Sequence, residues 1–245
     1  MSGNTPRVAL ITGASGGIGK AAAERLAREG HAIVVHYAGG KERAEEVAQA
    51  VRDAGGQAVI AAGDVADEHA MTEVFDLAER AFGGIDVVVH SAGIMPTAPI
   101  ADTDLDTFDR IQRVNVRGTF VVDRLAARRL RAGGAIINLS SSLTRLQTPT
   151  YGAYAASKGA VEAMTLILAR ELRGRDVTVN AVAPGPTATP LFFAGKSQET
   201  VDRIASLNPM GRLGEPADIA EAIAFLAGPG RWVNGQVIYV NGGAA

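Results

Sequence analysis

The chain has 245 residues, of which 47% are hydrophobic and 20% charged, and its formal net charge at pH 7 is −2. This composition is typical of a soluble globular protein and excludes disordered and collagen-like chains. The near-neutral balance argues against nucleic-acid and membrane-surface partners, because both favour a concentrated basic face. With no cysteine, the chain has neither thiolate nucleophiles nor disulfides, so its chemistry rests on oxygen and nitrogen side chains.

The sequence predicts one cytoplasmic domain over residues 1–245. No apolar run approaches the roughly 18 residues that span a bilayer. Met1 to Pro6 also lacks the basic and apolar regions of a signal peptide. No linker-like stretch divides the chain, whose length is ordinary for a single α/β domain.

Short β-branched runs alternate with helical patterns along the whole chain. The expected strands are 8–11, 33–35, 58–60, 87–89, 135–139, 177–182 and 236–240. The expected helices lie near 18–30, 44–55, 71–83, 106–131, 154–172 and 216–226, and Asp67 is a candidate N-cap for the third. Strands that are apolar on successive residues are typical of parallel sheets covered on both faces. The pattern predicts a Rossmann-like, doubly wound parallel sheet of about seven strands with right-handed crossovers.

Residues 184–208 interrupt this alternation. The segment is rich in Pro, Gly and Thr and contains the apolar run Leu191-Phe192-Phe193. A long irregular segment inside a compact domain is often a functional loop. We therefore expect a mobile lid over a substrate site.

A glycine-rich segment, Thr12 to Gly19, joins the first strand to the first helix. Glycines let the backbone turn sharply and approach a pyrophosphate, which the free N–H groups and positive dipole end of the helix then meet. The alternative is a tight packing turn. The residues expected at the coenzyme are Gly13, Ser15, Gly17, Ile18 and Gly19.

Tyr154 and Lys158 are four residues apart on an expected helix, so their side chains share a face. An ammonium beside a phenol can lower the phenol pKa from about 10 towards 7. The same spacing at Tyr37 and Lys41 crosses two glycines at a strand end, where helical spacing has no meaning. The alternative for Tyr154 is an amphipathic core tyrosine.

Ser140-Ser141-Ser142 ends the fifth expected strand, at the edge where such sheets bind ligands. A hydroxyl there can donate to a substrate oxygen, although serines at a strand end are more often part of a turn. The four histidines form no spaced cluster with carboxylates, so we expect no metal site.

Together these features resemble the short-chain dehydrogenase/reductase family, in its compact single-domain branch. The glycine pattern, the Tyr154-x-x-x-Lys158 pair and a serine thirteen residues before the tyrosine, Ser141, all match the family pattern. Other matches are Asn115, Ser91-Ala92-Gly93 in part, Pro184-Gly185, Thr187 and Thr189. His90 stands where the family usually has Asn.

The resemblance implies a mechanism and a set of roles. Tyr154 would protonate a carbonyl oxygen, Ser141 would hydrogen-bond it, and Lys158 would lower the tyrosine pKa and hold the nicotinamide ribose. Asn115 would position a relay water. The resemblance also implies that Ala92, Gly93, Pro184, Gly185, Thr187 and Thr189 bind the coenzyme, and that the protein is a homotetramer.

Two other functions fit parts of the pattern. Sugar-nucleotide epimerases share the Tyr and Lys spacing, but they usually carry a different glycine pattern and a longer substrate domain. A non-catalytic dinucleotide sensor on the same fold is the other alternative, since fold does not fix function. Such sensors typically lose the tyrosine or the lysine.

An apolar substrate pocket is expected around the catalytic group. The side chains expected to ring it are Met95, Pro96, Leu143, Leu146, Tyr151 and Leu191 to Phe193. This favours an apolar ketone or a 3-oxoacyl thioester, and the chain resembles carbonyl reductases and 3-oxoacyl carrier-protein reductases alike. Arg128, Arg129, Arg131, Arg173 and Arg175 are candidates for docking an acidic acyl carrier protein, or solvated helix ends.

The end of the second expected strand predicts NADPH rather than NADH. NAD-preferring folds place a carboxylate there, which repels a 2′-phosphate. Here the strand is followed by Tyr37, Gly39, Gly40 and Lys41, with no acid before Glu42. Asp64-Val65, after the third strand, is expected to hold the adenine.

Overall fold

The computed structural model describes residues 6–245. The signal-peptide expectation, which concerns Met1 to Pro6, therefore falls almost wholly outside the described residues. Within residues 6–245, no helix combines the length and apolar character needed to cross a membrane.

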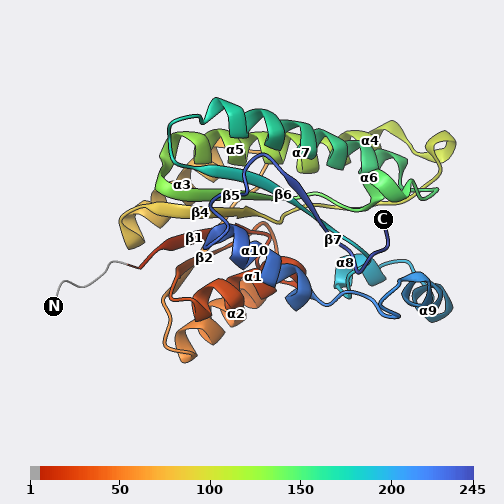
Figure 1. Ribbon diagram of the computed structural model, residues 1–245, viewed down its shortest axis with the longest axis horizontal. Coiled ribbons are helices and arrows are strands. Elements are labelled where there is room, and N and C mark those ends of the chain that lie inside the picture. The colour runs from red at the N-terminus through yellow and green to blue at the C-terminus, as the bar shows by residue number, and fades with distance from the viewer. Residues whose placement is uncertain (1–5) are drawn as a thin grey trace.

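A seven-stranded parallel sheet forms the centre of the molecule, in the order β3-β2-β1-β4-β5-β6-β7 (Figure 1). Its strands are β1 Val8–Thr12, β2 Ala32–Tyr37, β3 Ala58–Ala62, β4 Ile85–His90, β5 Leu130–Leu139, β6 Thr178–Pro184 and β7 Val237–Val240. All six strand pairs are parallel. The predicted fold class and strand number are confirmed.

Helices cover both faces of the sheet, as Figure 1 shows. One face carries α1 Gly17–Arg28, α2 Lys41–Asp53 and α10 Pro216–Ala227, and the other carries α3 Glu68–Phe82, α5 Gly118–Arg129 and α7 Gly152–Glu171. Successive strand residues face opposite clusters, so Ile11 packs with the first group and Leu10 with the second. The unbroken apolar runs of the sequence thus come from burial on both sides. Asp67 is the N-cap of α3 and accepts hydrogen bonds from two backbone N–H groups, as expected.

The expected helix 106–131 is divided in the structure. It consists of α4 Leu105–Ile111, a π-helical turn Gln112–Arg117, and α5. The strand that follows begins at Leu130 rather than at residue 135, because Leu130 pairs with Ile85 beyond a register shift. Gly133 lies in the irregular first part of β5 and has φ +81°, a conformation that favours glycine.

Residues 184–208 contain regular structure that the sequence analysis missed. Two short helices, α8 Pro190–Phe193 and α9 Gln198–Leu207, lie in this segment, capped by the hydroxyls of Thr189 and Ser197. Two small helices, α6 Leu143–Leu146 and η1 Ile100–Asp102, lie elsewhere in loops. The mobility of the segment stays a prediction.

Candidate active site

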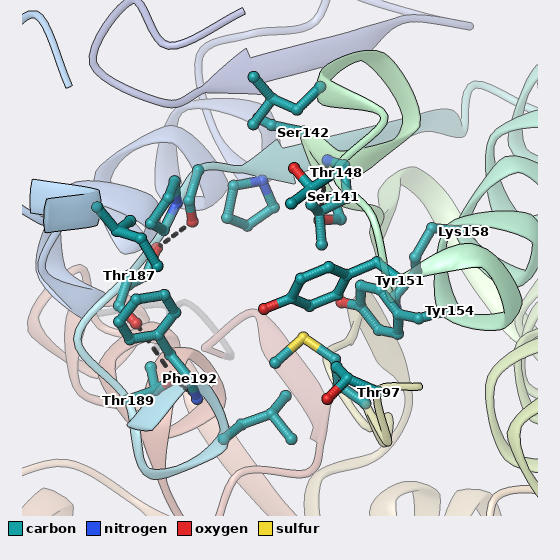
Figure 2. Close-up of a pocket in the computed structure, with 18 of the residues that line it drawn as sticks. Thr97, Ser141, Ser142, Thr148, Tyr151, Tyr154, Lys158, Thr187, Thr189 and Phe192 are labelled. Atoms are coloured by element: carbon teal, nitrogen blue, oxygen red, sulfur yellow. Dashed lines mark hydrogen bonds between the residues drawn. The ribbon is translucent and has the colours of Figure 1, made fainter. Parts of the chain in front are cut away.

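The strand order reverses between β1 and β4, and in such sheets ligands bind at the carboxyl ends of the strands near this point. A cavity of about 600 Å³ opens at this edge. Ser141, Tyr151, Tyr154 and Lys158 gather on one side of it, and Thr187, Thr189 and Phe192 face them across the space (Figure 2). Segments far apart in the sequence therefore meet in one site.

Tyr154 and Ser141 form the centre of the site. Tyr154 lies near the start of α7, and Ser141 follows the last residue of β5. Burial raises the pKa of Tyr154 to about 12, and the neighbouring Ser141 hydroxyl offsets part of that rise. Ser141 Oγ also accepts the backbone N–H of Leu143 at 3.3 Å, which orients the hydroxyl.

Lys158 lies one helical turn beyond Tyr154 and is buried. Its Nζ is 5.7 Å from the centre of the Tyr154 ring and donates to the carbonyl oxygen of Leu139 at 2.7 Å. Burial lowers the pKa of Lys158 to about 8. The expected lowering of the tyrosine pKa towards 7 is therefore not found in this structure, because burial of the phenol dominates. A phenol that keeps its proton at neutral pH suits a proton donor.

Asn115 lies in the π-helical turn and its side chain is fully engaged. Its Oδ1 accepts the N–H of Ile94 at 2.9 Å, and its Nδ2 donates to Ile94 O and to Ser157 Oγ. The amide thus ties the loop after β4 to α7. Its backbone carbonyl accepts the Thr119 hydroxyl at 2.6 Å and has a second lone pair, which is the atom able to hold a relay water.

The two neighbours of Ser141 donate their hydroxyls to other acceptors. Ser140 donates to Glu162 at 2.6 Å, and Ser142 donates to the carbonyl of Ala183. Glu162 also accepts the Thr144 hydroxyl, so one carboxylate of α7 holds both sides of the Ser141 loop. Sequence reasoning missed Glu162, although it lies two helical turns beyond Tyr154 on the same face.

The glycine-rich turn packs tightly against the loop after β4. Gly13 has φ +66°, and a Cβ there would lie 2.9 Å from the Cα of Ala92. A Cβ on Gly19 would lie 2.5 Å from Gly13 O, so both glycines also satisfy the packing alternative. Gly16, by contrast, faces open space at the start of α1. Of the expected coenzyme residues on this turn, Ile18 lines the cavity, whereas Gly13, Ser15, Gly17 and Gly19 do not.

The segment after β6 reaches this turn from the other side. A Cβ on Gly17 would lie 3.4 Å from Thr189 Cγ2, which is ordinary contact. Pro184, Gly185, Thr187 and Thr189 all line the cavity. The Thr187 hydroxyl donates to Gly185 O at 2.9 Å, one of the bonds drawn in Figure 2.

The end of β2 lies outside the main cavity and carries a residue that the sequence analysis missed. Gly39 is exposed, Gly40 is the N-cap of α2, and the Arg43 guanidinium lies directly against Gly40. Among the described residues, neither Lys41 nor Arg43 forms an ion pair. Two cations in the first turn of a helix oppose its dipole, and an anion between them would remove this cost. Two cations at the expected start of a helix are visible in the sequence, and this unfavourable placement could have indicated Arg43 as an anion-binding residue.

Asp64 and Val65 also lie outside the cavity, after β3. Asp64 accepts Arg113 Nη2 at 2.7 Å and the N–H of Ala66 at 2.9 Å. Burial opposes these bonds, yet the pKa of Asp64 is lowered overall by the hydrogen bonds and the Arg113 charge. Val65 is buried against Gly118.

His90 takes up a supporting role at the end of β4. Thr12 Oγ1 accepts the N–H groups of Ser91 and Ala92, so its own proton points to His90 Nδ1 at 2.8 Å. Burial, assisted by the charge of Lys158, lowers the pKa of His90 to about 3. The neutral imidazole therefore accepts the bond that orients Thr12 and, through it, the loop at Gly93.

The apolar wall of the cavity largely matches the expected one. Met95, Leu143, Leu146, Tyr151, Leu191 and Phe192 line it, whereas Pro96 and Phe193 do not. The arginines considered for a carrier protein are placed differently. Arg129 pairs with Asp76 and Glu79, and Arg131 pairs with Asp86 near the amino end of β5, opposite the cavity. They do not support docking at the site.

The residues at this edge fit a dinucleotide. The glycine turn leaves open space at Gly16, Gly93 lies close to Lys158, and the one charged residue between β2 and Glu42 is Lys41. Such a coenzyme would supply the hydride when bound. Within residues 6–245, no group of three or more His, Cys, Asp or Glu side chains is placed to hold a metal ion.

Comparison with known proteins agrees with this geometry. The family model described as enoyl-(acyl carrier protein) reductase matches residues 13–245. A short-chain type dehydrogenase/reductase of Picea abies is 47% identical over 97% of this chain and 92% of its own length. An NADPH-dependent aldehyde reductase-like chloroplastic protein of Arabidopsis thaliana is 46% identical over 97% of this chain and 93% of its own length.

A solved structure shows the same fold with a coenzyme. A short-chain dehydrogenase from Burkholderia cenocepacia in complex with NADP superimposes with a TM-score of 0.92, at 38% identity, and each chain is covered to 98%. The fold and site define a dinucleotide-dependent oxidoreductase. The chain belongs to the short-chain dehydrogenase/reductase family.

Proposed function

We propose that this protein transfers hydride between NADPH and a carbonyl or alcohol substrate, and that the substrate is an apolar or aromatic ketone or aldehyde. The observation that carries the proposal is the grouping of Ser141, Tyr154 and Lys158 at one side of an apolar cavity. Relatives named as NADPH-dependent aldehyde reductases and as an angucycline C-6 ketoreductase with bound NADP support it.

Each catalytic role follows from a hydrogen-bonding state. Tyr154 carries its proton at neutral pH and is able to donate it to a carbonyl oxygen. The Ser141 hydroxyl is held by the N–H of Leu143 and donates to the same oxygen. Lys158 has two ammonium protons beyond its bond to Leu139, which are available to a ribose. These three roles, together with Asn115 holding a relay water, form the proposed machinery.

The coenzyme residues follow from their positions. The pyrophosphate would lie at the start of α1, over Ser15, Gly17 and Ile18, with Thr187 and Thr189 on its other side. The 2′-phosphate would lie between Lys41 and Arg43, over the backbone N–H groups of Gly39 and Gly40. No carboxylate lies between the end of β2 and Lys41, and Glu42 is the one acidic residue in the first turn of α2.

A panel assay tests the proposed function. Purified protein is mixed with NADPH and with aromatic aldehydes, apolar ketones and a 3-oxoacyl thioester, and loss of absorbance at the coenzyme band is followed. We expect the aldehydes and ketones to give the higher kcat/KM. The thioester is the second candidate, suggested by the description of the matching family model. Coenzyme binding without turnover on every compound would favour a non-catalytic sensor.

A further inference from the structure

The charged side chains that line the cavity all carry the same sign. Lys158, Lys196 and Arg203 line it, and no aspartate or glutamate side chain of residues 6–245 does. Lys158 belongs to the catalytic group. Lys196 lies between α8 and α9, and Arg203 lies in α9. A cavity with apolar walls and one sign of charge concentrates ligands of the opposite sign.

Lys196 is held in place among aromatic rings. Its Nζ donates to the carbonyl of Phe192 at 2.7 Å, and it lies 4.8 Å from the centre of the Phe192 ring and 5.8 Å from that of Tyr151. Both rings line the cavity. The lysine is half-buried, so its ammonium has lost part of its hydration.

The ammonium still has binding capacity. An ammonium has three protons, and only the one bonded to Phe192 has a protein oxygen as its partner. Among the described residues, no carboxylate forms an ion pair with Lys196 or with Arg203. The ring contacts account for the position of Lys196 but leave its charge without a counterion, and an anionic group on a ligand would provide one.

We propose that Lys196 is the anion-binding group of the substrate site, and that the substrates used best carry a carboxylate or an ionised phenol remote from the reacting carbonyl. The aromatic body of such a substrate would lie along Tyr151 and Phe192, with its carbonyl at Tyr154. Figure 2 shows the Tyr151 hydroxyl pointing into the cavity from the side of Tyr154. The inference rests on the proposed reductase function and narrows its substrate class.

Matched substrate pairs test the charge and separate it from shape. We compare 4-carboxybenzaldehyde and 6-formyl-2-naphthoic acid with their methyl esters. The two acids differ in the distance between the aldehyde carbonyl and the carboxylate. A third pair is 4-hydroxy-3-nitrobenzaldehyde, ionised at neutral pH, and its methyl ether. Lys196→Met is expected to lower kcat/KM at least tenfold for the anionic member of one pair or more, mainly through KM. The neutral members should change less than about twofold.

Two further variants serve as controls. Lys196→Arg keeps the charge and is expected to retain most of the preference for the anionic member. Lys20→Met removes a lysine on α1 that pairs with Glu24 and does not line the cavity, so it should leave every kcat/KM unchanged. Equal losses for anionic and neutral members in Lys196→Met would show that the lysine acts only through the aromatic rings and would overturn the proposal.

A binding measurement distinguishes failure of this inference from failure of the reductase function. The alcohol products of each pair cannot react with an enzyme already holding NADPH, so calorimetric titration into that complex reports affinity alone. A Lys196-dependent preference for the anionic alcohol, without turnover of any aldehyde, would support the anion site and contradict the reductase. Turnover of the aldehydes with no charge preference in wild-type protein would contradict the anion site alone.

Discussion

At the scale of single residues, the site depends on which hydroxyls are free to act. Three consecutive serines follow β5, but two of them donate their protons to Glu162 and to Ala183. The Ser141 hydroxyl donates to no protein acceptor among the described residues, and it lines the cavity together with Tyr154. The family resemblance selected Ser141 from the three serines, and the hydrogen bonds of Ser140 and Ser142 to other acceptors support that selection.

The first residue-scale prediction concerns the proton donor. Tyr154→Phe keeps the ring and removes the proton, so we expect kcat to fall by about 10²- to 10⁴-fold. NADPH affinity, measured by quenching of coenzyme fluorescence, should stay within about twofold. Tyr151→Phe is the matched control, because Tyr151 lines the same cavity outside the catalytic pair, and its kcat should fall less than tenfold. A Tyr154→Phe enzyme with near wild-type kcat would remove Tyr154 from its role.

The second prediction concerns coenzyme choice. Arg43→Met and Lys41→Met each remove one cation at the start of α2, and each should lower kcat/KM for NADPH by about tenfold. The value for NADH is the internal control and should not change, since NADH has no 2′-phosphate. Tyr37→Asp places a carboxylate at the end of β2 and is expected to reverse the preference. A wild-type preference for NADH would contradict this assignment.

At the scale of elements, most of the fold followed from local sequence, because each buried strand is a short β-branched run and each helix has an apolar face. The errors lie where distant contacts decide. Leu130 joins the sheet through Ile85, forty-five residues away, and no local signal marks that pairing. The four-residue helix α8 is too short to show an apolar period. In α9, Val201, Ile204 and Leu207 recur at helical spacing after the Ser197 cap, so this helix could have been predicted from the sequence.

The candidate site shows the same division. Motif residues such as Tyr154 were found because their spacing carries chemistry. Arg43 and Glu162 were not found, because their importance comes from their neighbours in the fold. Arg43 lies against the glycine that caps α2. Glu162 accepts the hydroxyls of Ser140 and Thr144. The pKa of Tyr154 was wrongly expected to fall, since burial depends on tertiary packing that spacing does not reveal.

One buried carboxyl links α5 to the sheet and gives an element-scale prediction. Asp123 Oδ2 accepts Asn138 Nδ2 at 3.0 Å, and Asn138 in turn contacts Thr165 on α7. Burial raises the pKa of Asp123 to about 7, and the Asn138 bond offsets only part of the rise. The folded state therefore keeps the proton to about pH 7, whereas an unfolded aspartate loses it near pH 4. This contribution to stability is complete below about pH 4 and is lost as the pH rises to 7.

Asp123→Asn should remove that dependence. We expect the free energy of unfolding of the variant to change less between pH 4 and 7 than that of the wild type, and the variant to be at least as stable at pH 7. Urea unfolding at several pH values measures it. Asp109→Asn, at an exposed position of α4, is the control and should follow the wild type. Parallel stability curves for Asp123→Asn and wild type would contradict the buried, protonated carboxyl.

At the scale of the whole molecule, several of the exposed large apolar side chains lie on α5, on α7 and around α10. Phe120 on α5 and Ile167 on α7 are 58% and 57% exposed. Phe225 and Trp232 are exposed near β7, the edge strand of the sheet. Large apolar groups on separate surfaces are typical of oligomer interfaces.

We therefore propose a homotetramer and predict four chain masses by light scattering at micromolar concentration. Ile167→Glu together with Phe120→Glu places charge on one surface and should give a smaller species, because burying unpaired charge is costly. Ala50→Glu, at an exposed position of α2, is the matched control and should leave the mass unchanged. A monomeric wild-type mass would contradict the proposal.

The reversal of strand order between β1 and β4 also has a consequence for how the chain folds. The bonds across this junction, such as Thr12 to His90, join residues 78 positions apart. Closing so long a segment is slow compared with forming helices and neighbouring strands. The glycine turn comes from one side of the junction and the Tyr154 helix from the other. During refolding, enzyme activity should therefore recover later than the helical signal in circular dichroism, which makes catalysis itself a reporter of the final docking step.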